Sequence, residues 1–224
     1  MKAVIFDMDG VLVNTEPLHF RCWRAIFADD GIDLDYDVYK RCIGSTMTYL
    51  LQLIRENYGK SFPDKQAVFD RMAAKKDELI AKEGYPRLPG LTELVHRLHG
   101  AGYLLAVASS SPMHHIDQAI GELGLAECFD AKISGENVEH PKPAPDTFLT
   151  AAKALDVDPA DCLVVEDSTN GGKAAKAAGM SCVWFHNPDS GEQDIPQAVL
   201  ELSSWEDKSG VEQLLKLLKE QKTR

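Results

Sequence analysis

Short apolar runs that end at polar residues recur along the chain. Five of these runs have the length of single strands: Lys2–Phe6, Leu104–Ala108, Ala131–Ser134, Cys162–Val165 and Ser181–Phe185. Bounded runs of this kind are typical of strands that are buried on both faces of a parallel sheet. Apolar residues at helical spacing follow in Leu91–Leu98, Ile116–Leu123, Phe148–Leu155, Gly171–Ala178 and Val211–Leu218. From residue 88 onward this alternation predicts an α/β fold with a Rossmann-like parallel sheet.

The segment after the first run has a different pattern. Helical spacing appears there without any intervening strand, in Leu18–Phe27, Val38–Cys42, Met47–Tyr58 and Val68–Ile80. Asn14–Pro17 and the Pro/Gly-rich stretch Tyr85–Gly90 flank this segment, as expected for connections between domains. We therefore expect a core domain made of residues 1–14 and 87–224, with an inserted helical cap domain at residues 15–86.

Charge and cysteine content narrow the classes of function. Asp and Glu number 35 against 24 Lys and Arg, and no basic block is present, which argues against binding to nucleic acid or an anionic membrane. The five cysteines are odd in number and lack CxxC spacing, which is typical of free thiols in a reducing compartment. The start of the chain is too short and too acidic for a signal peptide, and no apolar stretch approaches the roughly 18 residues of a membrane span. We expect a cytoplasmic protein.

The candidate chemistry lies where the predicted strands end. The polar segments at these ends are Asp7-x-Asp9-Gly10, Ser109–Ser111 and Glu166–Ser168, and Lys142 precedes another predicted helix. Ligands of open parallel sheets bind beyond the carboxyl ends of the strands. Converging carboxylates need a cation, and ligands that are all oxygen favour Mg²⁺, whereas hydroxyls and an ammonium suit a phosphate. This combination suggests phosphoryl transfer through an aspartyl phosphate.

Each feature also has a plainer explanation. Asp7–Gly10 could be a strand-ending turn, Ser109–Ser111 a helix N-cap, and Lys142 a solvated surface lysine. Glu166–Ser168 could cap the helix that follows it. Four such features, at strand ends or in a loop, are harder to explain separately than as one site.

Four segments resemble the haloacid dehalogenase superfamily, in the phosphatase branch whose helical cap follows the first strand and whose nearest group is β-phosphoglucomutase-like. The segments are VIFDMDGVLVNTEPLHF (4–20), AVASSS (106–111), HPKPAPDTF (140–148) and VVEDSTNGGKAAKAAGM (164–180). The resemblance covers essentially the whole chain. It implies a monomeric enzyme that uses Mg²⁺ and acts on a small phosphorylated metabolite.

The resemblance also implies roles for residues of the strand ends. Asp7 matches the nucleophile, and Asp9 matches the general acid/base that protonates the leaving oxygen and then activates water. The phosphoryl group is expected to meet Gly10, Ser109, Ser110 and Lys142. Asp167 matches the main acidic Mg²⁺ ligand, with Glu166 as a further ligand or a partner of one. Asp7 and the carbonyl oxygen of Asp9 complete the expected metal ligands.

The role of Asp9 carries two requirements. The resemblance implies a loop after Asp7 that turns Asp9 toward the leaving group. Asp9 would also need a raised pKa to be protonated on demand. Within the superfamily, dehalogenases lack this acid, so Asp9 indicates a phosphatase or a phosphomutase.

Residues of the helical segment 15–86 are expected to distinguish a phosphatase from a phosphomutase. Thr15 and His19 match hinge and positioning residues of the mutase-like group, and Lys76 aligns with a cap lysine, although His19 could merely pack and Lys76 could be solvated. Met47, in the loop Gly44–Met47, stands where β-phosphoglucomutases have an arginine that clamps the distal phosphate, and Ser45 and Thr46 would replace it only in part.

This departure favours a Mg²⁺-dependent phosphatase of a sugar phosphate or related metabolite. A sugar phosphomutase is the alternative, and a non-catalytic protein that binds a phosphorylated metabolite is a more distant one. Trp23 is a further candidate for substrate contact, or a core residue of the cap. Asp189–Asp194 is expected to be an exposed acidic loop.

Overall fold

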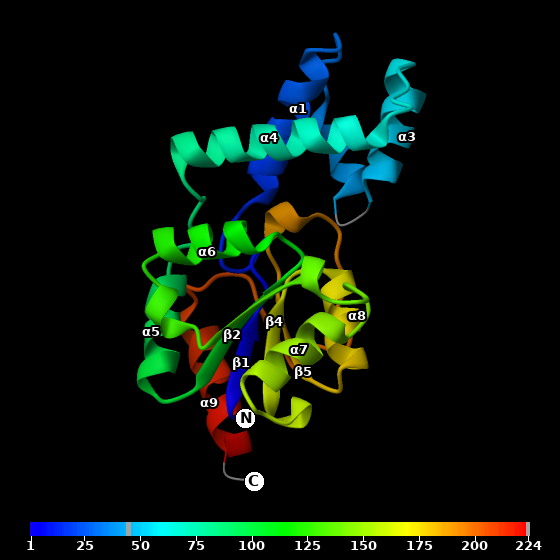
Figure 1. Ribbon diagram of the computed structural model, residues 1–224. Coiled ribbons are helices and arrows are strands. Elements are labelled where there is room, and N and C mark those ends of the chain that lie inside the picture. The colour runs from blue at the N-terminus through cyan, green and yellow to red at the C-terminus, as the bar shows by residue number, and fades with distance from the viewer. Residues whose placement is uncertain (44–45, 223–224) are drawn as a thin grey trace.

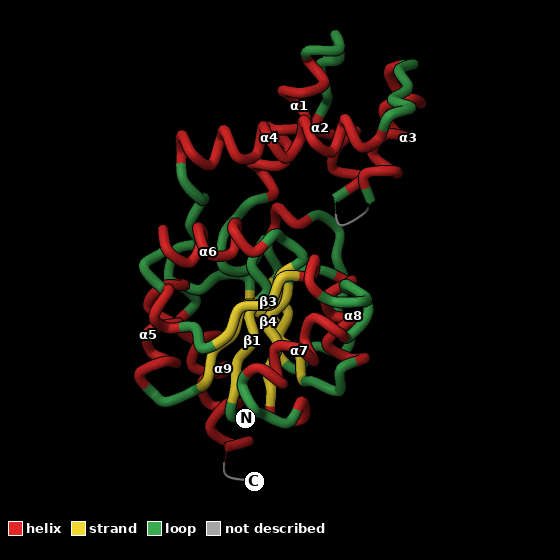
Figure 2. The backbone as a smooth tube through the Cα atoms, in the orientation of Figure 1, coloured by secondary structure: helices red, strands yellow, loops and turns green. Residues whose placement is uncertain are grey.

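The computed structural model describes residues 1–43 and 46–222, and the side chains as far as residue 220. A six-stranded parallel sheet lies at its centre, in the order β3-β2-β1-β4-β5-β6 (Figures 1 and 2). The strands are β1 (Ala3–Phe6), β2 (Leu104–Ser109), β3 (Ala131–Ser134), β4 (Cys162–Glu166), β5 (Ser181–Phe185) and β6 (Leu200–Leu202). The five predicted strands and the Rossmann-like fold class are confirmed. The sixth strand was not predicted, because its three residues form no distinct apolar run.

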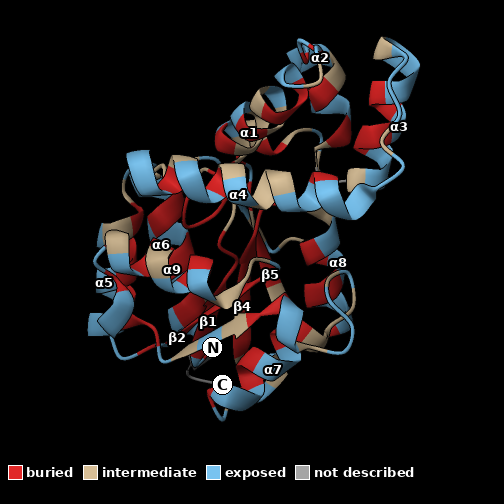
Figure 3. Ribbon diagram, turned by 45° about the horizontal axis from the view of Figure 1, so that its top comes forward, coloured by how far each residue is buried: buried red, intermediate tan, exposed pale blue. Residues whose placement is uncertain are grey.

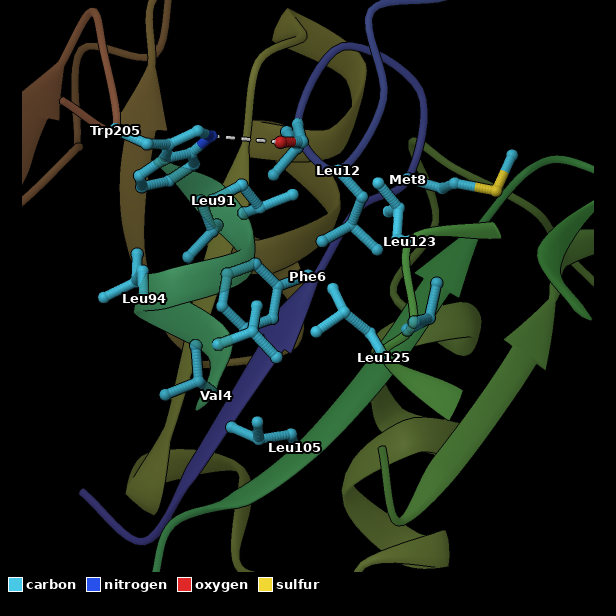
Figure 4. Packing of buried hydrophobic residues seen from close by; sticks show 14 of the residues in the cluster. Val4, Phe6, Met8, Leu12, Leu91, Leu94, Leu105, Leu123, Leu125 and Trp205 are labelled. Carbon is cyan, nitrogen blue, oxygen red and sulfur yellow. Dashed lines mark hydrogen bonds between the residues drawn. The ribbon is translucent and has the colours of Figure 1, made fainter. Parts of the chain in front are cut away.

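Helices cover both faces of the sheet, which explains why its central strands β1, β2 and β4 are mainly apolar and buried (Figure 3). One face packs against α5 (Leu91–Gly100), α6 (Met113–Glu122) and α9 (Lys208–Lys222). The other face packs against α7 (Asp146–Ala154) and α8 (Thr169–Ala177). The first face is shown in Figure 4, where Phe6 of β1 lies among Leu91, Leu94 and Leu105.

The remaining helices form a separate layer above the carboxyl ends of the strands (Figure 1). They are α1 (Glu16–Ala28), α2 (Tyr36–Tyr39), α3 (Met47–Tyr58) and α4 (Lys65–Glu83), and we call them the helical layer. Local signals define their ends: the side chains of Thr46 and Asp64 accept hydrogen bonds from Tyr49 N and Ala67 N, and Gly59 ends α3 with φ of 68°.

The helical layer has two kinds of apolar contact. Its outer part has its own buried cluster, which includes Phe27, Leu50 and Ile54. Its inner part, with Leu18 of α1 and Ile80 of α4, joins the cluster of the sheet. We call the six-stranded sheet with the helices on its two faces the sheet domain. The helical layer is therefore packed on the sheet domain while keeping a core of its own. Within the part of the chain that the structure describes, no helix is long and apolar enough to cross a membrane.

Candidate active site

The site begins where β1 and β4 end side by side. Phe6 of β1 is in register with Val165 of β4, and Asp7 N donates a hydrogen bond to Val165 O at 2.9 Å. On the other side of β1, β2 ends at Ser109. Strand order reverses direction at β1 and β4, and ligands of open α/β sheets bind at such a point. The parallel sheet thus brings three of the predicted motifs to one edge.

A tight turn directs Asp9 to the same side as Asp7. Leu12 N and Val13 N both donate to Met8 O, and Gly10 N donates to Val13 O at 2.8 Å. The chain therefore leaves strand geometry after Phe6, and both Asp7 and Asp9 line one cavity. The expected loop after Asp7 is confirmed. Trp205 supports the turn from behind, because its indole N–H donates to Val11 O at 3.2 Å (Figure 4).

Asp7 lies in a buried group of three carboxylates and one ammonium. Lys142 Nζ donates to Asp7 Oδ1 at 2.6 Å and to Glu166 Oε1 at 2.8 Å. Asp167 completes the group, since its ligand atom and those of Asp7 and Glu166 lie within 4.8 Å of one another. Lys142 is therefore held inside the site, and the surface-lysine explanation of it is wrong.

The charges of this group are only partly balanced. Burial raises the pKa of Asp7 to about 8, and the neighbouring carboxylates of Glu166 and Asp9 add to the effect of burial while Lys142 opposes it. Burial and the charges of Glu166 and Asp7 also raise the pKa of Asp167 well above its ordinary value. Burial tends to lower the pKa of Lys142, but Asp7 and Glu166 outweigh it and the pKa is raised. Three carboxylates against one ammonium leave room for a further cation.

Glu166 and Asp167 differ in how far the protein satisfies them. Both oxygens of Glu166 have partners, since Oε1 accepts from Lys142 and Oε2 accepts from Ser168 N at 2.7 Å and from the Ser168 hydroxyl. Ser168 in turn caps α8, so the capping explanation holds for Glu166 and Ser168. Asp167 accepts on Oδ2 from the hydroxyl of Ser190, and no hydrogen bond from a backbone N–H or an ammonium to its carboxylate is found among the described residues. Of these two residues, Asp167 has the freer carboxylate for a metal.

Gly10 makes room for Asp167. A Cβ at position 10 would lie 2.0 Å from Asp167 Oδ2, and the φ of +83° already disfavours any other residue. The backbone of Gly10 is fully used within the protein, because its N–H donates to Val13 O and its carbonyl accepts from Asn187 Nδ2. The structure therefore gives Gly10 a steric function beside the metal-ligand candidates.

Hydroxyl groups and an ammonium surround Asp9. The Thr15 hydroxyl donates to Asp9 Oδ1 at 2.6 Å, and the Ser111 hydroxyl donates to Oδ2 at 2.7 Å. Lys76 Nζ of the helical layer is 3.8 Å from Oδ1, and Lys76 is buried. Thr15 and Lys76 thus meet the site at Asp9, and Lys76 is not a solvated residue.

These neighbours reverse the expected protonation of Asp9. Burial alone would raise the pKa of Asp9, but the charges of Lys76 and His19, with the hydroxyls of Ser111 and Thr15, outweigh burial and hold the pKa below its ordinary value. The expectation of a raised pKa at Asp9 is wrong for this arrangement. Its physical reason is that Lys76 and the hydroxyls stabilise the carboxylate form.

The three serines at the end of β2 have separate positions. Ser109 is buried, and its hydroxyl accepts from Ser111 N at 3.0 Å and lies 3.5 Å from Asp9 Oδ2. Ser110 is exposed, and both it and Ser111 line the cavity. The N-cap of α6 is Pro112, which makes no side-chain cap, so the N-cap explanation of the serines is not supported.

The cavity extends from the strand ends into the helical layer, with a volume of about 560 Å³. His19, Met47 and Trp23 line it, and His19 Nδ1 is 3.7 Å from Glu16 Oε2. Trp23 also stacks on Phe27 at 5.6 Å, so it is both a wall and a core residue. Thr46 lines the cavity as well, whereas Gly44 and Ser45 lie outside the described residues.

Sequence reasoning missed several residues that support the site. The Ser111 hydroxyl, for which no role was predicted, donates to Asp9, and the Ser190 hydroxyl donates to Asp167. Asn187 binds Gly10 O and also Asn14, 173 positions away. The expectation of an exposed acidic loop at Asp189–Asp194 is wrong in part, because Asp189 Oδ2 accepts from Asn14 and Ser190 is buried. No local pattern marks these contacts, since their partners are distant along the chain.

Known proteins resemble this chain in sequence and in structure. The family model of haloacid dehalogenase-like hydrolases matches residues 1–179. Hexitol phosphatase B of Escherichia coli K12 is 34% identical over 199 residues, covering 88% of each chain, and β-phosphoglucomutase of Bacillus subtilis is 35% identical over 188 residues, covering 82% of each. CbbY from Rhodobacter sphaeroides, solved in complex with phosphate, superimposes with a TM-score of 0.79 at 27% identity, covering 95% of this chain and 99% of the other.

Proposed function

This chain belongs to the haloacid dehalogenase-like hydrolase family and is a phosphatase, and from that premise we propose that it hydrolyses a small sugar phosphate or related phosphomonoester through an aspartyl phosphate on Asp7. The observation that carries the proposal is that two aspartates line one cavity and have different neighbours. Asp7 faces a buried ammonium beside other carboxylates, and Asp9 faces hydroxyls and Lys76.

In the first half of the reaction a carboxylate oxygen of Asp7 attacks the phosphorus atom. The bond between phosphorus and the ester oxygen breaks, and the leaving alcohol takes a proton from Asp9. Lys142 offsets the charge of Asp7 and of the incoming phosphoryl oxygens, since its Nζ is 2.6 Å from Asp7 Oδ1. The hydroxyl groups of Ser110 and Ser111, which line the same cavity, are available to the phosphoryl oxygens.

In the second half water attacks the phosphorus atom of the aspartyl phosphate. Asp9 accepts a proton from this water, the bond to Asp7 breaks, and inorganic phosphate leaves, so that both aspartates return to their starting forms. The carboxylate form of Asp9, which its neighbours favour, is the form that serves as a base in this step. The acid step needs the protonated form, which the neighbours of Asp9 disfavour.

The residues present fit a magnesium ion. The oxygen-only group of Asp7, Glu166 and Asp167 has more negative charge than Lys142 balances, and Mg²⁺ prefers such ligands. We propose that Asp7, Asp167 and the carbonyl of Asp9 hold the ion, with Glu166 positioning Lys142. When bound, Mg²⁺ would offset the carboxylate charge and polarise the phosphoryl oxygens.

The cations of the cavity favour hydrolysis over a mutase reaction. A mutase must hold a bisphosphate, and its second phosphate needs a cation of its own. Among the described residues of the cavity wall, the ammonium groups are those of Lys142 and Lys76, and each already faces an aspartate. Met47 offers no charge, and positions 44 and 45 are Gly and Ser in the sequence.

We further propose that residues 15–86 act as a cap over the core of residues 1–14 and 87–224. Opening of the cap would admit substrate, and its closure would exclude bulk water. The substrate side of the cavity, with His19, Met47 and Lys76, comes from this segment. The monomeric state and the cytoplasmic location stay predictions. So does the expectation that neither nucleic acid nor a membrane is a partner.

The test is release of inorganic phosphate from a panel of sugar and sugar-alcohol phosphates, with Mg²⁺ or with EDTA. We expect Asp7→Asn to lower kcat by at least about a thousandfold, because the amide cannot act as the nucleophile. Asp117→Asn is the matched control, since Asp117 is an exposed aspartate that pairs with Lys132. It should retain the wild-type rate.

Each hexose 1-phosphate is also assayed with a trace of the matching bisphosphate. Conversion to the 6-phosphate with little release of phosphate would show a mutase and contradict the proposal. Binding of phosphate analogues without turnover of any substrate would instead support a non-catalytic binding protein.

A further inference from the structure

A second group of potential metal ligands lies where the helical layer meets the sheet domain. Asp77 comes from α4, and His114 and His115 come from the first turn of α6. One ligand atom of each lies within 4.8 Å of the other two, and His115 Nε2 is 3.2 Å from Asp77 Oδ1. The centroids of the two imidazole rings are 4.3 Å apart. The reaction described above uses none of these three side chains.

His115 is oriented by a partner on its other nitrogen. Its Nδ1 is 2.6 Å from the Tyr85 hydroxyl, and both residues are buried. Nε2 is therefore the nitrogen that faces Asp77. Histidine ligands of metals generally have their second nitrogen held by such a hydrogen bond, which fixes the ring and the tautomer. His115 thus already has the support that a metal ligand needs.

We propose that Asp77, His114 and His115 form a binding site for a divalent transition-metal ion such as Zn²⁺. Two imidazoles and one carboxylate are a frequent three-residue set for zinc, with water in the remaining position. The ion takes the place on Nε2 of His115 that a proton holds when Nε2–H donates to Asp77. That proton is then carried by Nδ1, which donates to the Tyr85 oxygen, so the ring stays neutral and no net proton is released.

The surrounding charges suit a divalent cation. Asp77 supplies a carboxylate ligand, and the ammonium of the neighbouring Lys76, whose charge also acts on His115, lies 3.8 Å from the Asp9 carboxylate. Mg²⁺ prefers oxygen ligands, whereas imidazole favours zinc, nickel or copper. The site therefore differs in chemistry from the oxygen-only group around Asp7, and the two are expected to take different metals.

The positions of the three ligands mean that a bound ion would affect movement of the helical layer relative to the sheet domain. Asp77 belongs to the helical layer, whereas His114 and His115 belong to the sheet domain, as the neighbouring courses of α4 and α6 show (Figure 1). An ion bound to all three would tie the layer to the sheet domain. If the layer acts as a cap, as the proposed function holds, zinc should slow turnover by hindering its opening.

Equilibrium dialysis of the metal-free protein against Zn²⁺, with a large excess of Mg²⁺ to occupy the oxygen-only group, measures the site directly. We expect one tightly bound zinc ion per wild-type chain. His114→Gln and Asp77→Asn should each weaken its binding by about tenfold or more. His99→Gln is the matched control, because His99 is also an exposed helical histidine but lies on α5. Cobalt bound at the same site should give visible absorption bands that His114→Gln removes.

Equal zinc binding by all four proteins would overturn the site, because the ion would then lie elsewhere. An equal loss of binding in His99→Gln would also overturn it. Inhibition is measured separately, as the effect of zinc on phosphate release by the wild type and by His114→Gln. Equal inhibition of both would overturn the effect on cap movement while leaving the site intact. If no substrate is hydrolysed, the proposed function fails, and dialysis still decides on the metal site.

Discussion

Two buried lysines each face one of the two aspartates, and they come from different parts of the molecule. Lys142 belongs to the sheet domain, and its Nζ makes two hydrogen bonds of 2.6 and 2.8 Å to Asp7 and Glu166. Lys76 belongs to α4 of the helical layer, and its Nζ is 3.8 Å from Asp9. The surroundings of Asp7, the proposed nucleophile, are thus complete within the sheet domain, whereas those of Asp9, the proposed general acid/base, depend on where the layer lies.

This difference has a physical consequence. A direct hydrogen bond between buried charges depends on a fixed geometry, and the loss of one partner leaves an uncompensated charge. A longer ion pair across two packed units changes whenever the units move. Changes in the sheet domain should therefore affect both folding and catalysis, and changes at Lys76 should affect catalysis alone.

The largest effect is expected from Lys142→Gln. Its loss leaves Asp7, Glu166 and Asp167 without a compensating ammonium, and should lower kcat/KM by about a thousandfold. Removal of one partner of a buried ion pair should also lower the free energy of unfolding by about 3 kcal/mol. Phosphate release and urea denaturation measure the two effects. Lys132→Gln is the control, since Lys132 has an exposed ion pair with Asp117 and should change neither quantity appreciably.

A smaller effect is expected from Lys76→Met, which keeps the length of the side chain but removes its charge. We expect kcat/KM to fall by roughly tenfold to a hundredfold, because the carboxylate form of Asp9, which serves as the base in the second half of the reaction, loses a charge that stabilises and positions it. The free energy of unfolding should stay close to the wild-type value. Lys75→Met is a matched control on the same helix, where the lysine pairs with Glu78 near the surface. Equal kcat/KM values for Lys76→Met and Lys75→Met would contradict the role of Lys76 at Asp9.

The parts of the site that could be predicted are those that strand geometry fixes. Asp7 and Glu166 follow apolar runs that pair in register, so their meeting follows from the parallel sheet alone. The contacts of Ser190 and Asn187 with Asp167 and Gly10 could not be predicted, because they come from a short helical turn after β5 that meets these residues only in the folded chain. The protonation of Asp9 was mistaken for the same reason, since Lys76 is distant in sequence. The three-residue β6 gave no apolar pattern to detect.

Ser111→Ala tests the serines at the end of β2, whose roles in the structure differ from those that the resemblance implies. The resemblance implies roles for Ser109 and Ser110, but the hydroxyl that lies 2.7 Å from Asp9 Oδ2 belongs to Ser111. Its removal should lower kcat/KM by about fivefold, the value of one hydrogen bond, while Thr15 continues to hold Oδ1. Ser110→Ala is the matched control, and an effect on KM with unchanged kcat would fit contact with the phosphoryl group. A larger loss of kcat in Ser110→Ala than in Ser111→Ala would contradict the role of Ser111 in positioning Asp9.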